Sequence, residues 1–167
     1  MGNLASLGPC RQPRSTVGGV GVVIDNDRCS IARALAVLGE RWSLQVVRDV
    51  FNGLQRFEDL REHLGIARNV LSNRLAGLVD AGLLERVPYR EFGSRQRHEY
   101  RLTAAGRELW PVLVTLMDWG DRHLADGPPP VEPEHVGCGG KVSMVPVCAH
   151  GHVLTEPQRE LGLRLSS

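Results

Sequence analysis

The sequence predicts a mostly helical domain that contains one small β-hairpin, which is an α+β fold. Two observations lead to this prediction. Apolar residues recur at helical spacing in a series of segments that begins near Cys29 and ends near residue 126. Residues 83–91 and 96–103 alternate instead like two strands, with Gly93 and Ser94 at the turn between them.

The chain has 167 residues, a length that suits one domain with tails. Residues 1–25 are rich in Gly, Pro and Ser, and we expect them to be flexible. The domain is expected over residues 26–126, and a Pro-led tail that contains a Cys/His hairpin follows over residues 127–167. Because no apolar stretch approaches the roughly 20 residues of a membrane span, we expect a cytoplasmic protein without a membrane partner.

Composition excludes several classes of protein. The net charge of +1 indicates no particular partner, and four cysteines are too few for a disulfide scaffold. No phosphate-binding glycine loop, nucleophile elbow or His-Glu-x-x-His motif occurs, and His63 and His98 are isolated, surface-type histidines. We therefore do not expect an enzyme.

The first two helices are each expected to end at a glycine. Asp27 is the expected N-cap of the first helix, and Gly39 ends it. The second helix begins near Arg41, and Gly53 follows it in the C′ position. Its expected buried residues are Trp42, Val46, Val47 and Val50.

A helix-turn-helix motif is expected next. A short third helix spans about Glu58 to His63, and Gly65 turns the chain into a fourth helix that buries a leucine stripe. A second stripe of this fourth helix carries no acidic residue. Amide, hydroxyl and guanidinium groups can bind base edges in the DNA major groove, where phosphates would repel acids. The candidate DNA-binding residues on this helix are Arg68, Asn69, Ser72, Asn73 and Arg74.

The predicted hairpin is rich in arginine and follows the motif as a wing, so the fold class is a winged helix-turn-helix. Arg90, Arg95 and Arg97 are expected over the DNA backbone or minor groove, where they would add salt-dependent affinity. This combination favours double-stranded DNA as the partner. A winged helix that binds protein without binding DNA is the alternative, because a fold does not determine a function.

Thr103 is expected to cap one long final helix. This helix and the first helix carry more apolar surface than a small domain buries internally, which predicts a homodimer with a long terminal dimerisation helix. A two-fold dimer would read two half-sites of an inverted-repeat operator. The alternative is that both helices close the core of their own domain. The candidate interface residues are Ile31, Leu35, Leu109, Leu113 and Leu116.

The stretches CSIARALAVLGERWSLQVV, RFEDLREHLGIARNVLSNRLAGLVDAGLLERVPY and RHEYRLTAAGRELWPVL together resemble the HxlR-type bacterial transcriptional regulators, relatives of the MarR group. The resemblance runs from about Cys29 to Trp119. It implies a homodimeric winged-helix protein that controls nearby genes, and we expect a repressor. Ala67 stands where the family usually has a Ser or Thr cap, and the wing tip reads FGSRQ where the family has Pro-Pro.

Cys29 lies in the first turn of the first predicted helix, next to Arg28 and one turn before Arg33. A helix N-terminus and nearby cations both favour a thiolate. Some members of the HxlR-type family sense oxidants or electrophiles through a cysteine here, so Cys29 is the redox-sensor candidate. The alternative is a small packed residue that never reacts. Alternatively, a small-molecule effector would control the activity of the regulator.

The tail carries His and Cys at spacings that can supply four ligands to a structural zinc ion, although the usual Cys-x-x-Cys pairs are incomplete. The candidate ligands are His135, Cys138, Cys148 and His152, with His150 as an alternative to His152. A hairpin with exposed histidines and reduced cysteines, or a Cys138–Cys148 disulfide, would explain the same residues. No cofactor is expected to be required.

Overall fold

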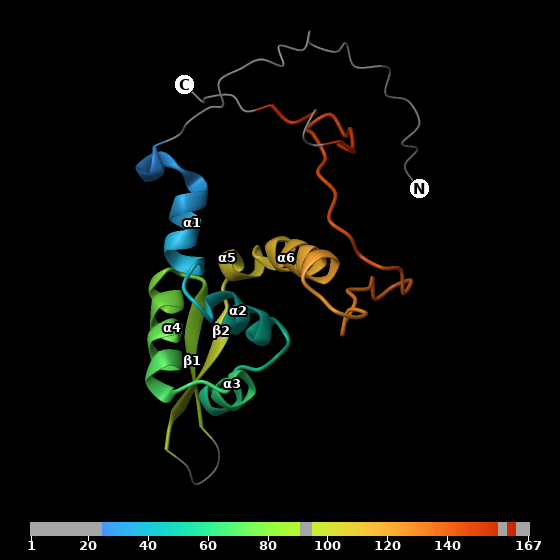
Figure 1. Cartoon of the computed structure of the whole chain (residues 1–167). Coiled ribbons are helices and arrows are strands. Elements are labelled where there is room, and N and C mark those ends of the chain that lie inside the picture. Colours follow the sequence, from blue (N-terminus) through green and yellow to red (C-terminus); the bar gives the residue numbers. More distant parts are fainter. Residues whose placement is uncertain (1–24, 91–94, 157–159, 163–167) are drawn as a thin grey trace.

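The computed structural model describes residues 25–90, 95–156 and 160–162, and Figure 1 shows their arrangement. Most of the expected flexible segment 1–25 and the hairpin tip at Gly93 and Ser94 lie outside the described residues. The elements in chain order are η1 (Asn26–Arg28), α1 (Ser30–Leu38), α2 (Ser43–Phe51), α3 (Phe57–Leu64), α4 (Arg68–Asp80), β1 (Leu84–Tyr89), β2 (Arg97–Leu102), α5 (Ala104–Arg107) and α6 (Trp110–His123). The predicted α+β winged helix-turn-helix is confirmed.

The helices α2, α3 and α4 and the hairpin share one hydrophobic core. The leucine stripe predicted on α4 supplies a third of it, because residues four and seven positions apart lie on one helical face. The core residues are Val46, Val47, Val50, Leu60, Ile66, Leu71, Leu75, Leu78 and Leu84. Apolar burial on this scale is the main force that holds α3 and α4 in their relative positions.

The hairpin is attached to the helices along one edge. Strands β1 and β2 pair antiparallel from Leu84 opposite Leu102 to Tyr89 opposite Arg97. The amide of Tyr100 also donates a 2.7 Å hydrogen bond to the carbonyl of Gln55, just before α3. The wing therefore cannot swing freely relative to the helix-turn-helix, because backbone bonds join them.

The first two helices both end at the glycines that the sequence predicts. Their starts differ from the prediction. Asp27 lies in η1 and does not cap α1; Cys29 precedes α1 and makes no side-chain cap bond. Trp42 is the residue before α2, has a left-handed φ of 82° and is only half-buried. An acidic residue near a helix start was thus a misleading signal, since the chain forms a separate short turn there.

The single final helix predicted after Thr103 is wrong, because the structure has two helices, α5 and α6. Thr103 does cap the first of them, accepting a 3.1 Å hydrogen bond from the amide of Gly106. The break falls just before Pro111, which lies in the first turn of α6. Proline has no N–H to continue a helical ladder but suits a helix start, which explains both the break and the restart.

Two glycines should respond oppositely to alanine substitution. A Cβ on buried Gly106 would overlap the carbonyl oxygen of Leu83, whereas a Cβ on Gly77 of α4 would meet nothing within 4 Å. We expect Gly106→Ala to lower the free energy of unfolding by about 1–3 kcal/mol through overpacking. Gly77→Ala should raise it by about 0.5–1 kcal/mol through helix propensity. Urea unfolding followed by circular dichroism measures both, and equal signs would contradict the packing at Gly106.

None of the helices in the described ranges is long and apolar enough to cross a membrane.

Candidate nucleic-acid interface

The turn between α3 and α4 orients α4 at the surface. Gly65 ends α3 with a left-handed φ of 63°, and its amide donates a 3.0 Å hydrogen bond to the carbonyl of Arg61. Ile66 is buried just after the turn and anchors it to the core. Ala67 precedes α4 without a side-chain cap bond, so the amides at the start of α4 lack the cap that a Ser or Thr would provide.

A buried carboxylate fixes α3 against α2. Asp49 is fully buried on α2, and its Oδ2 lies 2.8 Å from Nδ1 of His63 at the end of α3. Its Oδ1 accepts a 2.8 Å hydrogen bond from Nε of Arg48. His63 is exposed as expected but is not isolated. Asp49 was not among the residues predicted from the sequence, although an acid within the run of buried valines on α2 was a signal that it would need a partner.

The exposed face of α4 carries the short polar side chains that the sequence predicts. Asn69, Ser72 and Asn73 are all exposed, and their i, i+3, i+4 spacing places them on one face. No residue of α4 before its last position, Asp80, is acidic. This face can therefore approach a phosphate-rich surface without charge repulsion.

The two arginines predicted on α4 have intramolecular partners. Arg74 is half-buried, and its Nη1 lies 3.0 Å from Oε2 of Glu40 in the chain between α1 and α2. The Nη2 of Arg68 lies 2.6 Å from Oε1 of Glu58 on α3. Arg74 thus pairs with the connection between α1 and α2, whereas Arg68 stays exposed beside Asn69. Hydrogen bonds from Arg61 and Arg68 hold the pKa of Glu58 below its ordinary value, so this carboxylate stays charged at neutral pH.

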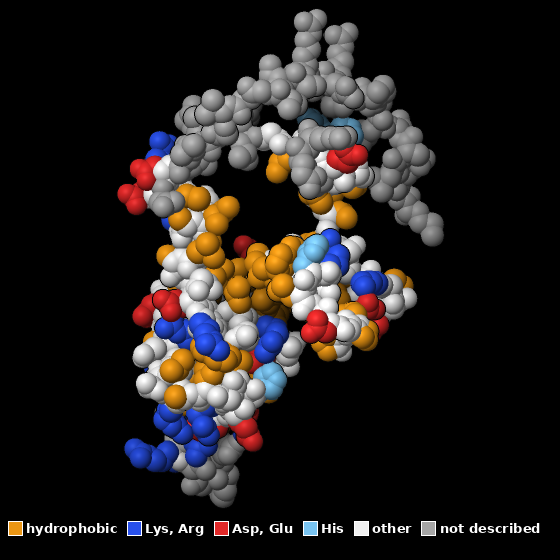
Figure 2. Space-filling model, viewed as in Figure 1, with side chains coloured by type: hydrophobic (Ala, Val, Ile, Leu, Met, Phe, Trp, Pro, Cys, Tyr) orange, Lys and Arg blue, Asp and Glu red, His pale blue; other side chains and the backbone are white. Residues whose placement is uncertain are grey.

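The wing and α4 meet at a basic hollow. Figure 2 shows basic side chains, which are arginines here, gathered at the hairpin end of the domain. A cavity of about 480 Å³ there brings Arg68 of α4 together with Arg97 of β2, and Glu58 and Asp59 of α3 also line it. Two further arginines of this hollow, Arg56 and Arg86, were not among the predicted DNA-binding residues. Arg90 and Arg95 are exposed on either side of the hairpin tip.

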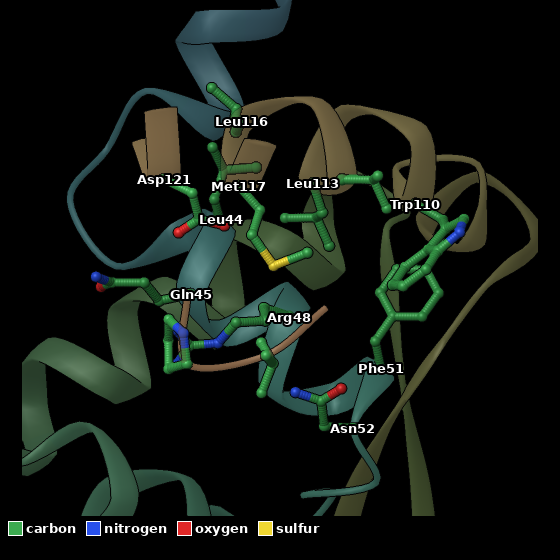
Figure 3. A pocket seen from close by; sticks show the side chains of 13 residues that line it. Leu44, Gln45, Arg48, Phe51, Asn52, Trp110, Leu113, Leu116, Met117 and Asp121 are labelled. Atoms are coloured by element: carbon green, nitrogen blue, oxygen red, sulfur yellow. The ribbon is translucent and has the colours of Figure 1, made fainter. Parts of the chain in front are cut away.

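A second cavity lies between α2 and α6, away from the basic hollow. Its volume is about 570 Å³ and its lining is mainly apolar. Figure 3 shows Phe51 and Trp110 facing each other at one end and Met117 pointing into the middle, with Arg48 and Asp121 at the margins. The ring centroids of Phe51 and Trp110 are 5.7 Å apart. The cavity has the size and lining of a small-molecule site.

The predicted interface residues separate into two groups. Ile31 and Leu35 on α1 are 70% and 55% exposed, and α1 contributes no buried residue. Leu116 on α6 is also exposed. Leu109 and Leu113 instead are half-buried against the core of their own domain. Trp119, which the prediction omitted, is exposed on α6.

The comparison with known proteins agrees with this geometry. Residues 37–127, more than half of the chain, match the HxlR-like helix-turn-helix family. A relative from Mycobacterium tuberculosis, described as an uncharacterized HTH-type transcriptional regulator, is 46% identical over 123 residues, which cover 72% of this chain and 76% of the relative.

Solved structures show the same similarity. The crystal structure of PA1607, a candidate transcription factor, superposes with a TM-score of 0.70 at 36% identity, covering 81% of this chain and 94% of that chain. The redox regulator HypR in its reduced form has a TM-score of 0.51 at 26% identity and covers 56% of this chain and 92% of that chain. With the matching helix-turn-helix and wing, these similarities establish that the chain belongs to the HxlR-like helix-turn-helix family and is a winged helix-turn-helix transcriptional regulator.

Proposed function

We propose that the protein is a homodimeric repressor that binds an inverted-repeat operator in a sequence-specific manner. The exposed face of α4 around Asn69, Ser72 and Asn73 would lie in the major groove of each half-site. The basic hollow and the wing would contact the adjacent backbone. The observation that carries this proposal is the acid-free polar face of α4, which continues into the basic hollow through Arg68. A dimer seated on an operator excludes other proteins from that DNA, which favours repression.

The exposed apolar side chains of α1 and α6 support the dimer. Figure 1 shows α1 projecting away from the domain, and Figure 2 shows apolar side chains along it and over α6. A helix with no buried residue gains little stability from its own domain, so α1 requires a covering surface. A second copy offers the same apolar helices in a self-complementary arrangement, with α1, Leu116 and Trp119 as its centre.

Fluorescence anisotropy of the purified full chain tests the proposal. The probe is duplex DNA from the region upstream of its own gene, compared with a shuffled duplex, at low and moderate salt. We expect preference for the native duplex and affinity that falls steeply with salt, because phosphate contacts release counterions. If this duplex shows no preference, a selection from genomic fragments decides the question. If no fragment were enriched, and the chain instead bound another protein at high salt, a protein-binding winged helix would be favoured.

Cys29 is the proposed site of an oxidant response. It is half-buried at the start of α1, where any change in its side chain would disturb the proposed dimer contact. HypR, whose solved structures resemble this chain, is described as a redox regulator and has both a reduced and an oxidized structure. We expect a thiol oxidant to weaken operator binding and Cys29→Ser to resist that loss. Ser30→Ala is the matched control, because it changes the next residue at the start of α1 without removing a thiol and should leave the loss intact.

The cavity between α2 and α6 is the proposed site of a small-molecule effector, the other option for control. Its lining favours an apolar, aromatic-sized molecule. An environment-sensitive naphthalene sulfonate dye is a suitable probe: it should bind saturably, and Met117→Trp, which fills the cavity, should prevent that binding. Dye binding that Met117→Trp leaves unchanged would place the dye elsewhere and remove the support for this site.

Glu58 is expected to restrain DNA binding. Its carboxylate forms an ion pair with Arg68 and places negative charge inside the basic hollow. Glu58→Gln should therefore raise affinity for both specific and shuffled DNA, by roughly three- to tenfold at low salt, and steepen the salt dependence. Anisotropy titrations at several salt concentrations measure the effect. Asp118→Asn is the control, because it breaks a comparable surface pair with Arg122 on α6. Weaker binding by Glu58→Gln would indicate that Glu58 orients Arg68 productively, and unchanged binding would show that Glu58 does not restrain DNA binding.

A further inference from the structure

The tail contains two small turns of similar design. In the first, the amides of Cys138 and Gly139 donate to the carbonyl of His135 at 3.1 and 2.8 Å, and Glu134 pairs with Lys141 as a β-bridge. Each turn contains a glycine at positive φ, 67° at Gly139 and 81° at Gly151.

In the second turn, the amide of Cys148 donates to the carbonyl of His152 at 2.9 Å, and the amide of Gly151 donates to the carbonyl of Cys148 at 2.9 Å. Val147 and Val153 form the β-bridge that closes this turn. The two turns thus hold a cysteine and a histidine in the same manner, although their order along the chain is reversed.

Each turn holds a sulfur and a ring nitrogen at a distance suited to one metal ion. Sγ of Cys138 lies 3.3 Å from Nδ1 of His135, and Sγ of Cys148 lies 3.2 Å from Nδ1 of His152. Zinc binds sulfur at about 2.3 Å and nitrogen at about 2.0–2.1 Å, so two such ligands of a tetrahedral ion lie about 3.6 Å apart. Both pairs therefore need to open by only a few tenths of an ångström.

The tail lacks the apolar burial that would otherwise hold these turns. None of its described side chains, in residues 127–156 and 160–162, is buried, and Val136 is 99% exposed. Segments this small usually depend on a metal or on disulfides for their structure. Figure 1 shows the two turns at different ends of the tail, and among the described residues no third His, Cys, Asp or Glu completes either pair. Each turn therefore presents two potential metal ligands, one sulfur and one nitrogen.

We propose that the two turns come together to bind one Zn²⁺ ion per chain. The ligands are His135, Cys138, Cys148 and His152. Residues 139–147 link the turns, and because extended chain spans roughly 3.3–3.6 Å per residue, this linker can hold the turns apart or loop back to join them. His152 is the proposed ligand in place of His150 because its Nδ1 lies 3.2 Å from Sγ of Cys148.

The protons and charges balance when the site binds zinc. Each cysteine releases its thiol proton on binding, so two thiolates neutralise the charge of Zn²⁺, while both histidines bind as neutral rings. Both rings bind through Nδ1, because this nitrogen already faces the sulfur in each pair. Four protein ligands leave no open coordination position, so the zinc is structural and not catalytic. Metal uptake is then coupled to folding of the tail.

Cobalt substitution of the reduced full chain tests the proposal. After chelator treatment, Co²⁺ should bind at one ion per chain and show tetrahedral visible bands with thiolate charge-transfer absorption. Cys138→Ser and Cys148→Ser should each remove about half of the charge-transfer absorption. His152→Ala leaves three protein ligands and a water, so it should shift the tetrahedral bands and weaken Co²⁺ binding while keeping both thiolate contributions. His150→Ala and Cys29→Ser are matched controls that should retain the full spectrum. Circular dichroism and DNA anisotropy report whether the winged domain of each variant is intact.

The contrary outcomes are distinct. A spectrum of hydrated octahedral Co²⁺, or one that neither cysteine variant changes, would overturn the site. Binding of one ion per two chains, restored by mixing the two cysteine variants, would overturn the single-chain arrangement. A Cys138–Cys148 disulfide in the purified chain, with no metal uptake after its reduction, would favour the disulfide. None of these results depends on operator binding.

Discussion

Replacing both Ser72 and Asn73 with alanine should remove most of the preference of the protein for its operator over shuffled DNA. Removing a side chain that binds a base edge in the major groove costs about 1–3 kcal/mol, so the specificity ratio should fall by about 30-fold or more. Both side chains are exposed on α4 and lie outside the hydrophobic core, so the free energy of unfolding should change by less than about 0.5 kcal/mol. Anisotropy titrations on both duplexes measure the ratio.

Arg97→Ala is the informative comparison for that variant. Arg97 lies in the basic hollow on β2, where a guanidinium would contact phosphate and not a base edge. Its removal should weaken binding to both duplexes equally and reduce the salt slope by about one. If the Ser72 and Asn73 variant behaved in the same way as Arg97→Ala, α4 would not be the element that reads sequence.

The double substitution Ile31→Glu and Leu35→Glu should convert the dimer into a folded monomer. Both side chains are largely exposed in the single chain, so charge there costs the domain little, but at a dimer interface it would be buried without a partner. A monomer can bind only one half-site, so operator affinity should fall by at least about a hundredfold, because the two half-sites act bivalently. Sedimentation or light scattering gives the mass, and anisotropy gives the affinity.

The matched control for this variant is Arg33→Glu on the opposite face of α1. It changes the net charge of the chain by the same amount but removes no apolar side chain. We expect Arg33→Glu to remain dimeric with a much smaller decrease in affinity. Dimers that persist in the Ile31 and Leu35 variant would show that α1 is covered by something other than the second copy.

Features that depend on residues close together along the chain can be predicted reliably from the sequence. Periodic leucines defined the buried side of α4, and Gly39, Gly53 and Gly65 marked helix ends, because turns at these points favour or require glycine. The same local reasoning predicted the hairpin and left Asn69, Ser72 and Asn73 on an exposed face. It failed at Pro111, because a proline that interrupts a helix was assigned to the interior of one continuous helix.

The sequence by itself thus determined the order of elements from α1 to β2, the core stripe and the family, since each depends on neighbours along the chain. Only the tertiary structure decided which distant charges meet: Asp49 with His63, Arg74 with Glu40, and Arg68 with Glu58. It also turned Leu109 and Leu113 inward while leaving α1 exposed. The physical reason is that these pairings depend on how helices pack against one another. The packing of the helices depends on the burial of the whole core, and the spacing of residues along the chain does not determine how the helices pack.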